Sequence, residues 1–287
     1  MTLLADLAQG LSFAFMQRAL VAGLLIALMC ALLGVFVVQR RLSFLGDGLA
    51  HAAFGGMGIG AFVIVGSGLI AEGVALLRNP LWIALPFALL TGLGIAWVRD
   101  RTELSSDTAI GVFFAVAVAL GVLFFSRIPP DANLGLNVMD LLFGSILAVR
   151  STELAIIAAV AAVSIALLLT IWGRLAYATF DDELARTDGV PARALEYLLF
   201  GLAAVVIAVS ATVVGIILMA AYLVIPAAAA RIWARSMASM TVIAVAIGTS
   251  TTLAGVAGSY LFDLPTGSAI ILTQALVFVL AAFTQRR

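Results

Sequence analysis

Nine apolar stretches, most of them long enough to cross a lipid bilayer, fill most of this chain of 287 residues. A hydrocarbon core about 30 Å thick needs about 20 apolar residues per helical crossing. Only 10% of the residues are charged, whereas a soluble domain carries about 25%. The sequence therefore predicts an all-α membrane protein, a polytopic bundle of eight or nine transmembrane helices in a single domain, residues 1–287. The expected spans are residues 14–38, 49–65, 81–98, 109–125, 155–172, 195–214, 216–232, 242–261 and 268–283.

Two segments leave the number of crossings open. The stretch 216–232 is short and contains Pro226, so it is either a full crossing or a broken element that inserts partway. The apolar piece 141–149 is too short to cross and is expected to be a re-entrant or surface helix.

The placement of basic residues predicts the orientation. All fifteen are arginines, and cytoplasmic loops retain positive charge. Alternating loops assign eleven arginines to one side and four to the other, which places the amino terminus outside, the carboxyl terminus inside and an odd number of helices between them. The four outer residues are Arg18, Arg78, Arg127 and Arg150.

Composition and missing motifs exclude several classes of function. The net charge is zero, which gives no sign of a nucleic-acid partner, and the single cysteine, Cys30, cannot form an intrachain disulfide. No G-x-x-x-x-G-K-[ST] loop is present, so any ATP hydrolysis must occur in another chain. We therefore expect no enzymatic activity.

Asp47 and the only histidine, His51, are the main candidates for metal chemistry. Residues four apart share one face of a helix, and a carboxylate with an imidazole is a reasonable ligand pair for zinc or a similar divalent metal. An ionisable residue at membrane depth is costly and points to function. The alternative is structural: Asp47 caps the second helix, and His51 bonds a neighbouring carbonyl. The glycines that follow, Gly55 to Gly60, also suit close helix packing.

The most polar loop, residues 173–196, contains a short helical pattern. Asp181, Asp182 and Glu183 suit its positive end, and Gly189 with Pro191 would stop it. This loop is either a solvated connection or a rigid knob that docks into a cytoplasmic partner.

Three segments together resemble the permeases of zinc and manganese ABC importers: MQRALVAGLLIALMCALLGVFVVQRRLSFLGDGLAHAAFGG (16–56), FDDELARTDGVPARALEYLLF (180–200) and VVGIILMAAYLVIPAAAARIWA (213–234). The resemblance implies a type II ABC importer permease in the bacterial cytoplasmic (inner) membrane. It also implies three partners: a second copy of the chain, a cytoplasmic ABC ATPase and an extracytoplasmic metal-binding protein.

The resemblance also assigns roles to residues. Asp47 and His51 match the family's intramembrane metal position, with no permanently bound cofactor. The segment 141–149 corresponds to the short helix near the outer gate, and the loop 173–196 contains the coupling helix. The implied outer-gate residues are Met139, Leu142 and Phe143, and the implied coupling residues are Asp181, Asp182, Glu183, Leu184, Ala185 and Gly189.

The expected function is import of a divalent metal, with zinc ahead of manganese or iron, because two copies of the chain would supply two carboxylates and two imidazoles, and zinc favours four ligands. The alternative is a secondary metal or proton transporter that uses Asp47 and His51 as a proton relay. Inverted repeats would favour that alternative, and the sequence contains no convincing one.

Overall fold

The computed structural model describes residues 12–67, 79–129 and 138–284, and every regular element within these ranges is helical. Nine of the described helices are long and apolar enough to cross a membrane. They are α2 (Ala14–Gln39), α3 (Leu45–Gly66), α4 (Leu81–Arg101), α5 (Ser106–Phe125), α7 (Ser151–Phe180), α9 (Ala192–Val214), α10 (Ile216–Trp233), α11 (Met237–Phe262) and α12 (Thr266–Thr284). Two short helices, α6 (Val138–Phe143) and α8 (Asp182–Thr187), and the 3-10 turn η1 (Ile146–Ala148) complete the described elements.

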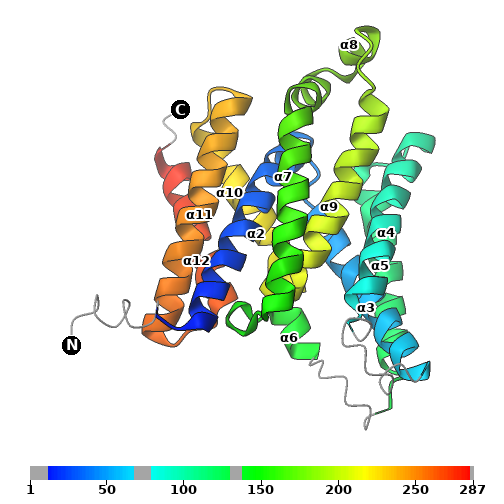
Figure 1. The fold of residues 1–287 in the computed structure, drawn as a ribbon. Helices are drawn as coiled ribbons and strands as arrows, with labels where there is room; N and C mark the ends of the chain where they lie inside the picture. The colour runs from blue at the N-terminus through cyan, green and yellow to red at the C-terminus, as the bar shows by residue number, and fades with distance from the viewer. Residues whose placement is uncertain (1–11, 68–78, 130–137, 285–287) are drawn as a thin grey trace.

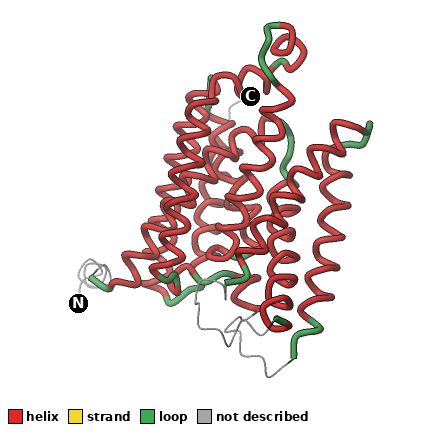
Figure 2. Tube along the Cα trace, turned by 45° about the vertical axis from the view of Figure 1, so that its right-hand side comes forward, coloured by secondary structure: helices red, strands yellow, loops and turns green. Residues whose placement is uncertain are grey.

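The long helices run side by side, and the short ones lie at opposite ends of the bundle (Figures 1 and 2). The helix α8 projects from the end where α2, α4, α7 and α10 finish, which we call the arginine-rich end. There, Arg40 bonds Thr179, and the indole of Trp233 donates to Thr284 near the end of α12. The helix α6 and the start of α2 lie at the other end, which we call the α6 end. The described chain therefore crosses the bundle an odd number of times.

The structure changes two expected bounds and decides whether α10 is continuous. The helix α3 begins at Leu45, four residues early, so Asp47 lies inside its first turn. The helix α10 is continuous through Pro226, which confirms a full-length element and contradicts a broken one. The expected loop 173–196 is largely helical, because α7 continues to Phe180 and α9 already begins at Ala192.

Burial is uneven among the long helices. Most of the apolar length of α2, α3 and α9 is buried, whereas only 22–28% of the apolar length of α5, α7 and α12 is buried. Apolar surface of this extent is stable only against lipid or another membrane protein. The three exposed helices therefore form the outer wall of the bundle.

Glycines on α3 allow its neighbours to approach closely. A Cβ added to Gly55 would lie 2.5 Å from the carbonyl oxygen of Ala117 on α5, and one added to Gly56 would lie 2.7 Å from the Cα of Ala84 on α4. Small residues of this kind are common where membrane helices pack. The glycine cluster is thus a packing feature that holds α3 between α4 and α5.

Buried hydrogen bonds join helices that are distant in sequence. The Tyr222 hydroxyl on α10 lies 2.5 Å from the Thr252 hydroxyl on α11 and donates to the Gly23 carbonyl on α2 over 3.3 Å. All three groups are inside the bundle. This contact ties three spans together where no water competes.

Tyr222→Phe should destabilise the folded protein by about 1 kcal/mol, the scale of hydrogen bonds between membrane helices. The measurement is the unfolding midpoint of the purified protein in detergent. Tyr260→Phe is the control, because the Tyr260 hydroxyl has no hydrogen-bond partner among the described residues. Equal midpoints for the two variants would contradict the assigned role.

Candidate metal site and coupling helix

Asp47 and His51 lie one turn apart on the same side of α3, and both are half-buried. The N-cap position of α3 is occupied by Phe44, so Asp47 does not cap the helix. No hydrogen bond or ion pair within the described part of the chain holds the Asp47 carboxylate. The carboxylate is therefore available to a ligand.

One hydrogen bond fixes the proton position on His51. Its Nδ1 lies 2.9 Å from the backbone carbonyl oxygen of Asp47. A carbonyl oxygen only accepts, so Nδ1 carries a proton and donates, and Nε2 is the ring nitrogen left for another ligand. Histidines that bind metals commonly donate their other ring N–H to a carbonyl or carboxylate in this way. The bond to the carbonyl, considered above as a structural alternative, therefore also prepares the ring for a metal.

The ring of Phe114 on α5 supports the imidazole. The centroids of the two rings lie 4.5 Å apart at an interplanar angle of 62°, an edge-to-face contact. The close approach of α3 and α5 makes this contact possible, and it restricts rotation of the His51 side chain. The site is thus preorganised on two packed helices.

One chain provides only part of a metal site. Among the described residues, no group of three or more histidine, cysteine, aspartate or glutamate side chains is close enough together to hold a metal ion. A zinc site needs about four ligands, or three with an open position. If Asp47 and His51 bind a metal, the histidine, cysteine and acidic side chains of the described part of one chain supply only these two ligands.

The helix α8 is a short, capped projection. The Asp181 side chain accepts a hydrogen bond of 2.9 Å from the Leu184 amide, and Asp182 pairs with Arg186 at 2.6 Å. After α8, Gly189 adopts a positive φ of 82°, and the Val190 amide bonds back to the carbonyl of Ala185, which is fully buried. The predicted acidic start and the Gly-x-Pro stop are both observed.

Apolar side chains stand exposed beside the acidic residues of α8. Phe180 is 67% exposed and Leu184 is 49% exposed, outside the apolar helix bundle. Two exposed large side chains beside a charged surface are typical of a contact made with another protein.

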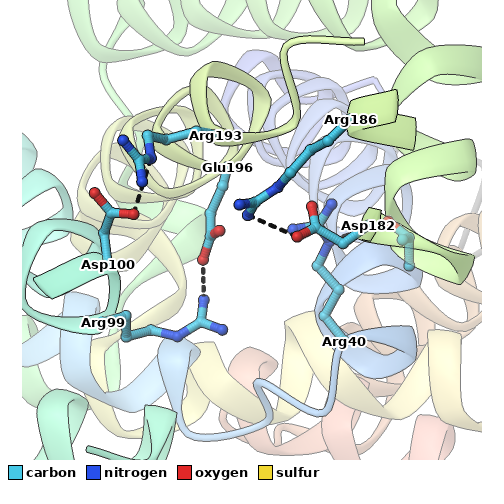
Figure 3. A network of polar contacts seen from close by, with 8 residues as sticks. Arg40, Arg99, Asp100, Asp182, Arg186, Arg193 and Glu196 are labelled. Carbon is cyan, nitrogen blue, oxygen red and sulfur yellow. Dashed lines mark hydrogen bonds and ion pairs between the residues drawn. The ribbon is translucent and has the colours of Figure 1, made fainter. Parts of the chain in front are cut away.

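Ion pairs join the start of α9, which follows α8, to the end of α4 (Figure 3). Glu196 on α9 pairs with Arg99 at the end of α4, and Arg193 pairs with Asp100 at 2.9 Å. Arg40 donates from Nε to the Thr179 hydroxyl over 3.0 Å, and burial lowers the pKa of its guanidinium, an effect that the nearby Glu196 partly offsets. In the sequence, these arginines indicate only the orientation of the chain in the membrane. The signal for these ion pairs in the sequence is the close spacing of opposite charges, Arg99 with Asp100 and Arg193 with Glu196.

The helix α6 lies at the opposite end of the bundle from α8 (Figure 1). Of the expected outer-gate residues, Leu142 is half-buried and Phe143 is 53% exposed. The side chain of Met139 lies outside the described part of the structure. The six residues of α6 pack against α9 and α10.

Comparisons with known proteins agree with one another. The model of the ABC 3 transport family matches residues 12–285. The high-affinity zinc uptake system membrane protein ZnuB of Haemophilus influenzae is 30% identical, over 96% of this chain and 99% of its own. The manganese transport system membrane protein MntC of Halalkalibacterium halodurans is 29% identical, over 96% and 89%.

A solved structure gives the same result. The structure described as PsaBC from Streptococcus pneumoniae in complex with Fab superposes with a TM-score of 0.81 at 30% identity, covering 98% of this chain and 96% of that one. The relatives of this chain are permease subunits of ABC transporters, in which the ATPase is a separate chain. This chain therefore belongs to the ABC 3 transport family, as the membrane subunit of a metal-ion ABC importer.

Proposed function

We propose that this permease imports zinc, with manganese or iron as the alternative cargo, through a site built from Asp47 and His51 of two copies of the chain. The observation that carries the proposal is the pairing of an unengaged carboxylate with an imidazole that is held through Nδ1 and leaves Nε2 for a ligand. Each chain brings one such pair. Two copies would supply four ligands, which suits zinc, and two negative charges, which balance a divalent ion.

The choice of zinc rests on that ligand set. Relatives named for zinc uptake and for manganese transport are similarly close to this chain. Two neutral imidazoles and two carboxylates suit the tetrahedral geometry of zinc, whereas manganese favours more oxygen ligands. Comparing uptake of zinc, manganese and iron by the reconstituted importer tests this choice.

The orientation and partners follow from the same architecture. We infer that the arginine-rich end faces the cytoplasm of a bacterial inner membrane, since positive charge is retained there. The exposed Phe180 and Leu184 would then meet the ATPase, and the α6 end would receive metal from an extracytoplasmic binding protein. Exposed apolar helices such as α5 and α12 would contact the second copy or lipid.

Asp47→Ala and His51→Ala should each reduce metal uptake by about a hundredfold or more, because a bare divalent ion cannot be desolvated without its ligands. The measurement is uptake of radioactive zinc into vesicles that contain the permease, its ATPase and its binding protein. Asp107→Ala is the control, because Asp107 is an exposed carboxylate in the first turn of α5. Uptake at the control level by both site variants would refute the metal site.

Asp181→Ala should uncouple the two reactions of the importer. Loss of the N-cap costs about 1 kcal/mol, and a helix of six residues is not stable without its cap and its contacts. We expect weaker co-purification of the ATPase and reduced metal-stimulated ATP hydrolysis. Asp181→Ser is the matched control, since serine retains a capping oxygen. If the alanine and serine variants gave the same turnover, α8 would not act through its capped shape.

A further inference from the structure

Two glycines from distant parts of the chain bring their backbones into direct contact at the α6 end. Gly144 ends α6 with a φ of 75°, and Gly215 separates α9 from α10 with a φ of 96°. Both values lie in a region that side chains other than glycine rarely adopt. A Cβ on Gly144 would lie 2.2 Å from the carbonyl carbon of Val214, and one on Gly215 would lie 2.4 Å from that of Phe143. No side chain fits between these two segments.

The start of α12 joins the same contact. A Cβ on Gly267 would lie 3.4 Å from the carbonyl oxygens of both Phe143 and Val214. The nearest neighbour of that Cβ is the Leu218 side chain of α10, at 2.6 Å. Three segments therefore meet here: the end of α6 and the break between α9 and α10 through their backbones, and the first turn of α12 beside both of them and the Leu218 side chain. With only six residues, α6 has little stability of its own, so this meeting point sets its position.

The other end of α9 is attached to the coupling helix. Only residues 188–191 separate α8 from α9, and the Val190 amide bonds to the carbonyl of Ala185 over 2.9 Å. Ion pairs from Arg193 and Glu196 fasten this end of α9 to α4 (Figure 3).

The helix α9 suits the transmission of motion between its two ends. Its 23 residues contain no proline, and most of them are buried. At 1.5 Å per residue, the helix is about 34 Å long. The helix packs against α3, α4, α7 and α10, with an open groove along its side between α4 and α7. A helix packed against several neighbours moves as one body, because packed interiors do not deform continuously. A tilt started at α8 would therefore arrive at Gly215.

We propose that Gly144 and Gly215 are positioning residues for the outer gate, which transmit movement of α9 to α6 through their backbone contact. The inference rests on the proposed function, in which α8 receives the ATPase and α6 borders the metal entrance. Because the contact contains no flexible side chains, a displacement of the α9–α10 break moves the end of α6 with it. A side chain at either position would separate the two segments and add strain.

Gly144→Ala and Gly215→Ala test the proposal in the full importer with its ATPase and binding protein. We expect the complex to assemble and ATP hydrolysis to continue, while zinc uptake falls by about tenfold or more, since forcing alanine into this backbone region adds strain and displaces α6. The controls are Gly173→Ala and Gly258→Ala, helical positions with open space around an added Cβ. Both controls should transport as the unmodified importer does. If Gly144→Ala and Gly215→Ala took up zinc as fast as the controls, the proposal would be overturned. It would also be overturned if, in assembled complexes, these variants lost ATP hydrolysis to the same extent as zinc uptake.

Hydrogen exchange on the unmodified importer gives a second test that does not depend on the variants folding. Adding a non-hydrolysed ATP analogue should change amide exchange in residues 141–149 and 213–219 together. A change in only one segment, or in neither, would overturn the proposal. Failure of the proposed function would appear as an absence of zinc uptake by the unmodified importer. Failure of this inference would appear in the exchange measurement, which does not depend on metal uptake.

Discussion

A doubly charged ion cannot enter a hydrocarbon layer unless protein ligands replace its water, and this constraint organises the permease. Charges are rare within the spans of this chain, so the few that are present must serve the ion or the fold. On α3, the His51 ring is fixed by the Asp47 carbonyl and by the edge of Phe114, and the Asp47 carboxylate is unengaged. Glycines of α3 allow it to pack closely against α4 and α5, and this packing holds the helix that carries the pair in place.

The second organising feature is the separation of the two ends of the bundle. The arginine-rich end carries α8, a capped projection next to the start of α9, which ion pairs join to α4. The α6 end carries a short helix seated on the break between α9 and α10. Because α9 touches both, one buried helix connects the surface proposed for the ATPase with the surface proposed for metal entry. Asp47 and His51, the pair proposed to bind the metal, lie on α3, which also packs against α9.

Sequence alone predicted most of the fold, because long apolar stretches in a bilayer have few alternatives to helices. It placed Asp47 and His51 on one face of a helix from their four-residue spacing, and it predicted the short helix α8 from its acidic start and Gly-x-Pro stop. It did not resolve whether Pro226 breaks its helix, since the packing around α10 decides that. It also missed the pairing of Arg99 with Glu196 and the contact of Gly144 with Gly215, which join residues far apart in sequence. Such contacts depend on how the helices are arranged in three dimensions, and hydrophobic periodicity carries no information about them.

The most direct test of the account is the ratio of metal to permease in the importer trapped with its cargo, combined with X-ray absorption at the zinc edge. A site shared by two chains predicts one ion per two permease chains, with nitrogen and oxygen ligands at about 2.0–2.1 Å and no bound ion when Asp47 is replaced by alanine. One ion per chain, or an unchanged ion in that variant, would contradict a metal site shared between two copies of α3.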